Sequence, residues 1–148
     1  VYGPGDNFDP ENAMVVPSLM SRIANGENPL KVWGDGSAVR DFAYSEDVAI
    51  GVIQALISGT NGEFVNLGSG QGYKVQELVE TLSEIVNFEY DFDTSKPNGF
   101  PKRVMDITKA RKLIGYNPKT SLKEGLRKTW DWFLSNRNEF LHRKNYFK

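Results

Sequence analysis

The 148-residue sequence contains no cysteine and a single histidine, His142. The absence of cysteine excludes a disulfide-bonded scaffold and any metal site built from thiolates. A single histidine argues against a zinc site with several histidine ligands and against a Ser-His-Asp triad within the chain. Catalysis by a His-ligated zinc ion or by an activated serine is therefore not expected from these residues.

Long apolar segments are also missing. The longest stretch without a formal charge, Val48 to Gly62, is interrupted by polar residues and glycines and is too short to span a bilayer. No positively charged segment followed by an apolar region opens the sequence, so no secretory signal is indicated, and we expect a cytoplasmic protein without a membrane partner. The first residues, Val1 to Gly5, include no initiator methionine, which predicts that the sequence is cut from a longer chain.

The net charge of −1 conceals an uneven distribution. From Lys96 to the C-terminus there are 14 lysines and arginines but only 4 acidic residues. Two interpretations remain open. Charge runs usually form a solvated helical surface, and the alternative is a stand-alone module that binds a polyanion or partner through this basic third. The basic residues are not interleaved with a base-stacking aromatic platform, so nucleic acid is not an expected ligand.

Hydrophobic periodicity and turn residues predict an α/β chain, and 39% hydrophobic residues suffice for a buried core at this length. Helices are expected over residues 14–25, 45–57, 75–86, 107–114 and from 122 onward, and strands over 30–33, 39–44, 64–67 and 88–92. Ser45 and Asp106 are expected to cap two helices, and Ser121 with Glu124 matches a capping box. The last helix should bury the face made of Leu122, Leu126, Trp130 and Phe133.

One glycine-rich turn imitates a dinucleotide-binding site. The run Gly68-Ser69-Gly70-Gln71-Gly72 lies between an expected strand and an expected helix, with Asp91 and Asp93 about twenty residues later. A pyrophosphate-binding turn needs its third glycine three residues after the second, so that the helix packs closely on the strand. Here that glycine comes one residue early, and we interpret the segment as a structural turn, with a cofactor site as the weaker alternative. None of the six tyrosines has a lysine four residues later, so the chain has no Tyr-x-x-x-Lys catalytic pair.

Three loop regions carry polar side chains that a core does not require. The first, Tyr2 to Phe8, is too rich in glycine and too polar for the interior of a helix or strand. Trp33 and Arg40 are seven residues apart across a Gly-Asp-Gly turn, and they supply an aromatic face and a guanidinium fork suited to a phosphate. An ion pair of Arg40 with Asp41 or Glu46 is the alternative for this side chain. The segment from Lys96 to Arg103 combines two prolines, a glycine and three cations, a composition that can close over an anion.

Five short motifs occur in order along the chain: Y-G-P-x-D-N-F, V-V-P, V-W-G-x-G-x-x-x-R-x-F-x-Y-x-x-D-V-A, N-L-G-S-G and F-D-T-S-K-P-x-G-x-P-K-R-x-x-D. Together they resemble the extended short-chain dehydrogenase/reductase family of nucleotide-sugar epimerases, dehydratases and reductases. The pattern is most similar to that of GDP-L-fucose synthases within the NAD-dependent epimerase/dehydratase family. The resemblance implies the carboxy-terminal part of a Rossmann-type NAD(P)-binding protein, with a small mixed sheet and several helices.

The resemblance also implies that residues 1–148 form one substrate-binding domain. The Rossmann half, with its glycine fingerprint and its Tyr-x-x-x-Lys pair, then precedes Val1 in a longer chain. NAD or NADP is held mainly by that other half, so this chain has no catalytic residue and is expected to be inactive alone. The implied partner is a nucleotide sugar linked to GDP, UDP or dTDP, and the full-length enzyme is expected to be a homodimer.

Individual roles are implied by the same resemblance. Val1, Tyr2 and Gly3 correspond to the place where the family's chain passes the nicotinamide end of the cofactor. Substrate-binding roles are implied for Asn7 in the floor of the site, Arg22 on the first helix, Trp33 beside the nucleotide, Arg40 on the diphosphate, Asn98 in a covering loop and Arg103 as a further phosphate contact.

Two positions depart from the pattern. GDP-L-fucose synthases carry a histidine proton donor immediately before the V-x-P triplet, and this chain has Met14 there, which cannot titrate. The histidine often found after Y-G-P is Gly5 here. We therefore do not expect 3,5-epimerisation, whereas 4-epimerisation, 4-ketoreduction and dehydration of a nucleotide sugar remain open, all using hydride transfer to or from NAD(P).

Overall fold

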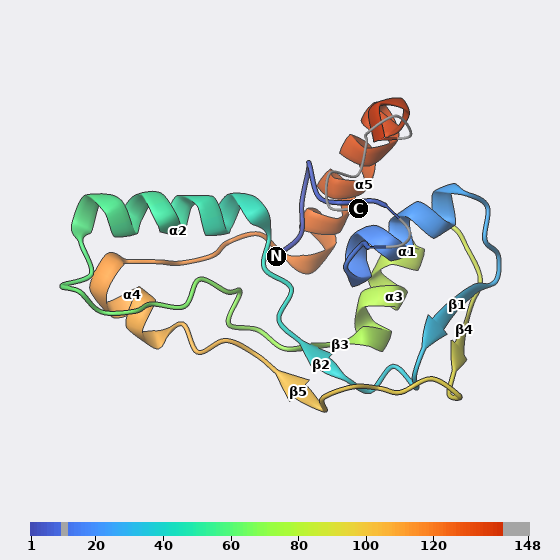
Figure 1. Ribbon diagram of the computed structural model, residues 1–148, viewed down its shortest axis with the longest axis horizontal. Coiled ribbons are helices and arrows are strands. Elements are labelled where there is room, and N and C mark those ends of the chain that lie inside the picture. The colour runs from blue at the N-terminus through green and yellow to red at the C-terminus, as the bar shows by residue number, and fades with distance from the viewer. Residues whose placement is uncertain (10–11, 141–148) are drawn as a thin grey trace.

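The computed structural model of the protein describes residues 1–9 and 12–140, so His142 lies outside the described residues. The elements in chain order are α1 (Val15–Ala24), β1 (Leu30–Trp33), β2 (Val39–Arg40), α2 (Ser45–Ser58), β3 (Tyr73–Lys74), α3 (Val75–Ile85), β4 (Tyr90–Asp93), β5 (Lys102–Arg103), α4 (Thr108–Ile114) and α5 (Leu122–Phe140). Figure 1 shows α2 at one end of the molecule and the β1–β4 pair at the other. The predicted α/β class is confirmed, and no helix in this part of the chain is long and apolar enough to cross a membrane.

The strands form two small sheets. β1 pairs in parallel with β4, which places Leu30 opposite Tyr90. β2 is the middle strand of a three-stranded sheet, antiparallel to β3 and parallel to β5, so the expected small mixed sheet is present. A single bridge between Tyr2 and Tyr44 ties the start of the chain to the segment that leads into α2. Each parallel pair therefore joins segments from opposite halves of the chain.

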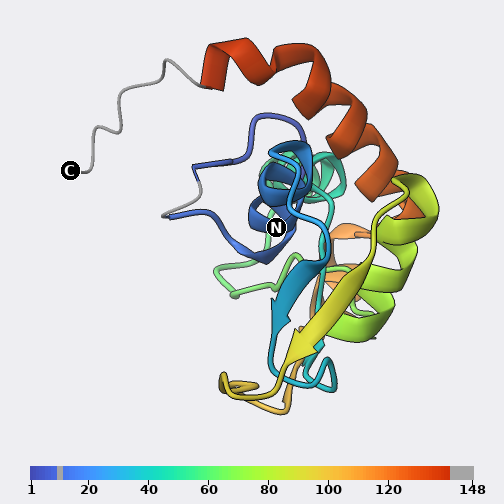
Figure 2. The same cartoon turned by 90° about the vertical axis from the view of Figure 1, so that its right-hand side faces the viewer.

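The main core lies between the β1–β4 pair and the helices α1, α3 and α5 (Figure 2). Met20 of α1, Leu30 of β1, Leu78 and Leu82 of α3 and Leu126 of α5 are completely buried. The predicted inward face of α5 is confirmed, because all four of its residues are buried and α5 packs against α3. The apolar surface removed from water by these elements is the main driving force for their association.

Three local predictions are wrong. Residues 64–67 form no strand, because no described strand pairs with them and Phe64 is 94% exposed. The strand expected over 39–44 is regular only over Val39–Arg40. Ser45 is the first residue of α2 rather than its cap, and its N–H donates to the carbonyl of Tyr2 (2.9 Å). Each error concerns a segment whose conformation depends on a partner far away in the sequence, which local patterns do not report.

Of the other predicted helix caps, Asp106 lies one residue before the N-cap position of α4, which is Ile107, and the box of Ser121 and Glu124 is present in part. Asp106 Oδ1 accepts the N–H of Thr108, the first residue of α4, at 2.9 Å. Ser121 Oγ accepts the N–H of Glu124 at 3.2 Å, which is one half of the predicted capping box. The carboxylate of Glu124 forms an ion pair with Lys128 (2.9 Å), one helical turn further on.

Candidate functional site

Four of the predicted substrate-binding residues gather where the two sheets meet, along the lower edge of the molecule in Figure 1. Trp33 ends β1, Arg40 lies in β2, Arg103 lies in β5, and Asn98 lies between β4 and β5. The parallel register places Arg40 opposite Arg103. Two connections border these residues, and we name them the Gly34 turn (residues 34–37) and the cover loop (residues 94–101).

Arg40 supports the cover loop from β2. Its Nη1 donates to the carbonyl of Phe100 at 2.6 Å and to the carbonyl of Val39 at 2.8 Å. Neither Asp41 nor Glu46 is its partner, so the alternative of a local ion pair is wrong. The guanidinium is half-buried, and no described residue accepts a hydrogen bond from its Nε or Nη2. The Nε and Nη2 donors of Arg40 therefore remain available for a further hydrogen-bond acceptor.

Asn98 fastens the cover loop to the Gly34 turn. Its Oδ1 accepts the backbone N–H of Asp35 at 2.7 Å. Gly34 has φ +84°, and a Cβ at this position would overlap Asn98 Oδ1. The glycine is therefore required both for the left-handed conformation and for the approach of Asn98. The Asp35 carboxylate accepts the N–H and hydroxyl of Ser37, and these hydrogen bonds hold its pKa below its ordinary value.

Exposed aromatic rings and cations alternate around this edge. Trp33 is 66% exposed, with the ammonium of Lys96 at 5.7 Å from its ring centroid. Phe100 is 63% exposed, and the guanidinium of Arg103 lies 4.6 Å from its ring centroid. Phe100 was not among the predicted site residues, although it lies inside the segment whose composition suggested an anion-covering loop. Such rings with adjacent cations offer stacking surfaces beside positive charge.

Of the three predicted cofactor-binding residues at the N-terminus, Tyr2 and Gly3 are held by backbone hydrogen bonds. Tyr2 donates its N–H to Ala43 (3.0 Å) and is buried, and its hydroxyl donates to the carbonyl of Leu122 (3.3 Å). Burial raises the pKa of the Tyr2 hydroxyl, so it stays protonated at neutral pH. Gly3 is packed so closely that a Cβ there would overlap Ser45 Oγ, whereas Val1 is exposed. The Tyr2 side chain thus has a packing role.

Asn7 lies in an exposed loop outside the group at the sheet edge. Its Oδ1 accepts the N–H of Asp9 at 3.0 Å. The neighbouring Asp6 accepts the N–H of Asn7 through Oδ1, while its Oδ2 is buried without a hydrogen-bond partner. Burial raises the pKa of this carboxyl. The amide nitrogen of Asn7 has no described partner, so the loop itself does not use it.

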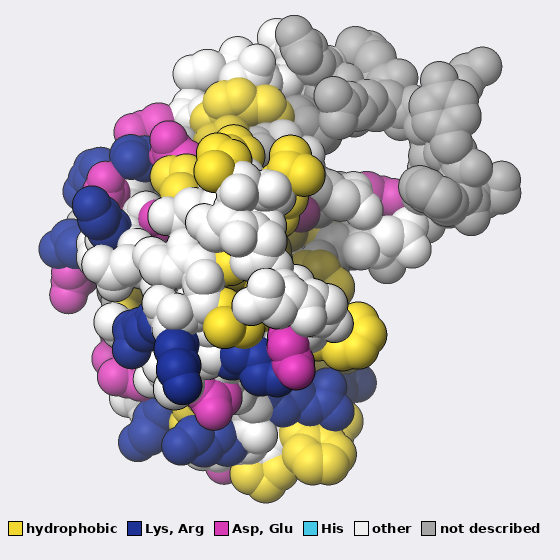
Figure 3. All heavy atoms as spheres, turned by 90° about the vertical axis from the view of Figure 1, so that its left-hand side faces the viewer, with side chains coloured by type: hydrophobic (Ala, Val, Ile, Leu, Met, Phe, Trp, Pro, Cys, Tyr) yellow, Lys and Arg dark blue, Asp and Glu magenta, His cyan; other side chains and the backbone are white. Residues whose placement is uncertain are grey.

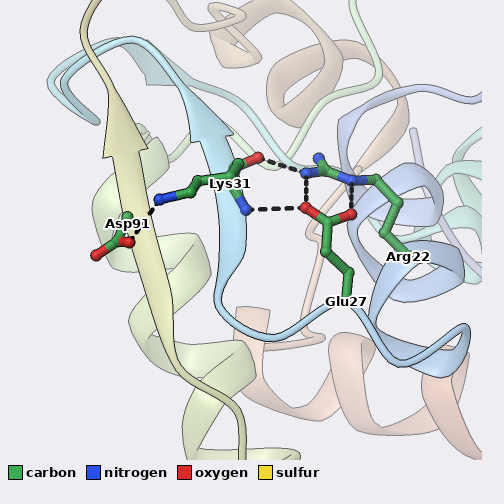
Figure 4. A network of polar contacts seen from close by, with 4 residues as sticks. All are labelled: Arg22, Glu27, Lys31 and Asp91. Carbon is green, nitrogen blue, oxygen red and sulfur yellow. Dashed lines mark hydrogen bonds and ion pairs between the residues drawn. The ribbon is translucent and has the colours of Figure 1, made fainter.

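Arg22 does not lie with the sheet-edge residues but clamps α1 to β1, as Figure 4 shows. Its Nε donates to Glu27 Oε2 at 2.7 Å, a second nitrogen pairs with Glu27 Oε1, and the same nitrogen donates to the carbonyl of Lys31. Glu27 in turn accepts the N–H of Lys31 at 3.0 Å. Every described contact of the Arg22 guanidinium is thus made within the protein. Arg22 therefore has a structural role that the sequence did not indicate, and this role competes with the predicted binding of a substrate.

This clamp predicts a pH-dependent stability difference between the protein and Glu27→Gln. Hydrogen bonding to Arg22 holds the pKa of Glu27 below its ordinary value, so its carboxylate stabilises the fold above the unfolded-state pKa near 4.3. We expect Glu27→Gln to lower the free energy of unfolding by about 0.5–1 kcal/mol at pH 6. The difference should vanish as the pH falls through the folded-state pKa, in urea titrations from pH 6 to 3. Glu89→Gln, whose carboxylate makes no described contact, is the matched control and should show no such trend.

The glycine-rich turn at 68–72 holds an internal carboxylate. Asp41 Oδ1 accepts the N–H and the hydroxyl of Ser69 at 2.8 and 2.6 Å. Asp41 Oδ2 accepts the N–H groups of Gly70 (3.1 Å) and Met105 (3.2 Å). Backbone N–H groups of the kind that cradle phosphates are thus occupied by a side chain of the same protein. The residues present do not fit a dinucleotide pyrophosphate at this turn, which favours the interpretation as a structural turn.

A cavity of about 340 Å³ lies elsewhere, between α2 and the connection from α4 to α5. Asp47, Gln54 and Lys119 contribute polar groups to its lining. The Asp47 carboxylate already accepts the N–H groups of Lys119 (3.2 Å) and Thr120 (3.0 Å), so it serves to join α2 to the start of α5. Within residues 1–9 and 12–140, no group of three or more acidic or histidine side chains is arranged to hold a metal ion.

Comparison with known proteins identifies relatives. Residues 1–68 match the NAD dependent epimerase/dehydratase family. GDP-L-fucose synthase 1 of Arabidopsis thaliana is 43% identical over 142 residues, which cover 92% of this chain and 44% of that protein. A crystal structure of UDP-glucose 4-epimerase from Thermotoga maritima with UDP-glucose matches with a TM-score of 0.80 at 34% identity, covering 92% of this chain and 44% of that one.

A GDP-L-fucose synthetase from Naegleria fowleri matches with a TM-score of 0.84 at 27% identity, covering 93% of this chain and 44% of that one. The chain thus spans a little under half the length of the relatives that it matches.

Proposed function

We propose that this chain, whose residues 1–68 match the NAD dependent epimerase/dehydratase family, forms the nucleotide-sugar-binding part of an epimerase, dehydratase or reductase of that family. The diphosphate of the nucleotide sugar would bind to Arg40, with Trp33 beside the nucleotide and Arg103 as a further cation. NAD or NADP would be held by the rest of a longer polypeptide, because the glycine-rich turn of this chain is filled by Asp41. The sugar would lie toward Asn7 and the N-terminal segment.

The observation that carries this proposal is the arrangement of Arg40 beneath the cover loop. One nitrogen of its guanidinium supports Phe100, while the opposite edge has no acceptor among the described residues. An anion bound there would receive a charge-assisted pair of hydrogen bonds, and Arg103 lies opposite in the register.

Two unpartnered apolar features support the proposal that this chain works as part of a longer enzyme and is inactive alone. α2 buries only Asp47 and Gly51 and leaves a row of aliphatic side chains exposed, namely Ile50, Val52, Ile53, Leu56 and Ile57. In Figure 3 hydrophobic side chains gather on the upper part of the face, where α2 lies. The unpaired segment 64–67 follows α2 and exposes Phe64. Exposed apolar surface of this kind is typical of contacts with another folded unit.

The alternative, a polyanion-binding module built on the basic C-terminal third, has weaker support. Lysines of this region on α4 and α5 form ion pairs with Glu63, Glu84 and Glu124, at 2.7 to 2.9 Å. The basic side chains therefore share their surface with acidic partners instead of forming one continuous positive field.

Ligand titration tests the proposal directly. The chain should bind GDP-, UDP- or dTDP-sugars in preference to single-stranded or duplex DNA, and it should not turn over any of them with NAD or NADP. Trp33 is exposed near the sheet that contains Arg40, so ligand binding should change the tryptophan fluorescence. Trp33→Phe should remove most of this change, whereas Trp132→Phe should retain it. Preference for DNA would support the alternative module instead, and turnover by the chain alone would contradict its assignment as a binding part.

A further inference from the structure

The cover loop and the Gly34 turn are joined at both ends by backbone hydrogen bonds. Gly34 donates its N–H to the carbonyl of Asp93 at 3.0 Å, just before the cover loop begins. Val39 donates its N–H to the carbonyl of Pro101 at 2.8 Å, where the cover loop ends. Between these two points, the described contacts that connect the loop to the turn and to β2 are made by side chains.

Asn98 makes the central connection. Its Oδ1 accepts the N–H of Asp35, a backbone donor for which the structure shows no other acceptor. The turn is shaped for this contact, because Gly34 adopts φ +84° and a side chain there would overlap Asn98. The Asp35 carboxylate is bound to Ser37 within the turn, so the turn is rigid on its own side of the contact.

Arg40 makes the second connection, from below the loop. Its Nη1 holds the carbonyl of Phe100 at 2.6 Å. Gly99 has φ +69°, and a Cβ there would lie 3.3 Å from Arg40 Nη2, so the loop backbone passes directly over the guanidinium. The path from Asn98 to Pro101 is thus fixed at three successive points: the turn, the guanidinium and β2.

We infer that Asn98 is a positioning residue rather than a substrate ligand: its amide oxygen latches the cover loop to the Gly34 turn and so presets Lys96 beside Trp33 and Phe100 over Arg40. The identity of the ligand rests on the proposed function, but the latch is a property of the unliganded chain. What the latch requires is a hydrogen-bond acceptor at the Oδ1 position. Aspartate retains this acceptor and alanine does not, but the Asn98 side chain also hydrogen-bonds the Asp35 carboxylate, so an aspartate at position 98 forms a weaker latch than asparagine does.

Amide hydrogen exchange in the ligand-free chain tests the latch. Asn98→Ala should speed exchange of the Asp35 amide, and of the amides in residues 94–101, by about threefold to tenfold. Asn98→Asp should exchange the Asp35 amide more slowly than Asn98→Ala does, because the acceptor is retained, although the two carboxylates repel one another. Thr94→Ala, in the same loop and without a described side-chain hydrogen bond, is the matched control and should change nothing. Gly34→Ala, which displaces Asn98 from the other side, should reproduce the effect of Asn98→Ala.

Binding of GDP and UDP to the same variants separates the latch from the proposed function. Failure of the unmodified chain to bind either nucleotide, with the exchange pattern as expected, would overturn the nucleotide-sugar proposal and leave the latch intact. An Asn98→Ala variant with weaker nucleotide binding but unchanged exchange at Asp35 would make Asn98 a direct ligand and overturn the latch. Unchanged exchange together with unchanged binding would also overturn it. Unchanged exchange at core amides such as that of Leu126 should show that the effect is local.

Discussion

Asp41→Ala should lower the free energy of unfolding by about 2–3 kcal/mol, because one carboxylate satisfies four donors, and no other acceptor is described for the three backbone N–H groups among them. Two of these donors belong to Ser69, and the others are the N–H groups of Gly70 and Met105. The carboxylate thereby joins β2 to the glycine-rich turn and to the segment after β5. Urea unfolding monitored by far-UV circular dichroism measures the loss, and the partial exposure of the bonds keeps the expected value below the range for a fully buried group.

Two further variants show how much of this loss of stability comes from each group. Asp41→Asn retains one acceptor oxygen and should cost about half as much as Asp41→Ala. Ser69→Ala removes a hydroxyl that donates to Asp41 and accepts the N–H of Gln71, but keeps the three backbone N–H groups on Asp41 paired, and should cost about 1 kcal/mol. Equal stability of Asp41→Ala and Asp41→Asn would mean that the carboxylate does not organise the turn as described.

Arg40→Ala should weaken binding of a GDP- or UDP-sugar by about tenfold to a hundredfold, the range expected for a lost hydrogen bond to a charged group. The substitution removes the proposed diphosphate contact and also the support under Phe100. Arg40→Lys keeps the charge but cannot hold the Phe100 carbonyl and present a two-nitrogen edge together, so it should recover only part of the affinity. Isothermal titration calorimetry provides the measurement.

Other arginines serve as controls for Arg40. Arg103→Ala should weaken binding only a few-fold, because Arg103 is exposed and its charge is screened. Arg127→Ala, on the exposed surface of α5, should leave the affinity unchanged. If Arg40→Ala binds the nucleotide sugar as tightly as the unmodified chain, Arg40 does not contact the diphosphate, and the proposed site loses its central residue.

Several features could be predicted from the sequence because they depend on local spacing. The buried face of α5 is indicated by apolar residues at helical intervals, and the structure confirms it. Trp33 and Arg40 lie close to the segment from Lys96 to Arg103 because β1 and β2 each have a parallel partner at either end of that segment. The predicted β1 and the approximate position of β4 were correct, and parallel pairing brings the carboxyl ends of both strands to the same side.

Other features depend on contacts that local patterns do not reveal. Arg22 finds Glu27 and the carbonyl of Lys31, so a cation that matched a substrate-binding pattern is used within the protein. The alternation that suggested a strand over 64–67 requires a neighbouring strand, and the described residues supply none. The role of Asn98 depends on the N–H of Asp35, more than sixty residues earlier. For Asn98 and for residues 64–67 the partner that decides the conformation is distant in the sequence or absent from the described residues, and for Arg22 it is a residue only five positions away that no predicted motif includes.

The pairing pattern also determines when this protein can fold during synthesis. Both parallel pairs join residues about sixty positions apart, Leu30 with Tyr90 and Val39 with Lys102, and parallel pairing of this kind closes slowly. The hydroxyl of Tyr2 finds its acceptor only when the carbonyl of Leu122 has been made. A nascent chain emerging from the ribosome therefore has no complete sheet until β4 is out, the three-stranded sheet waits for β5, and α5 is the element whose arrival allows the core to close.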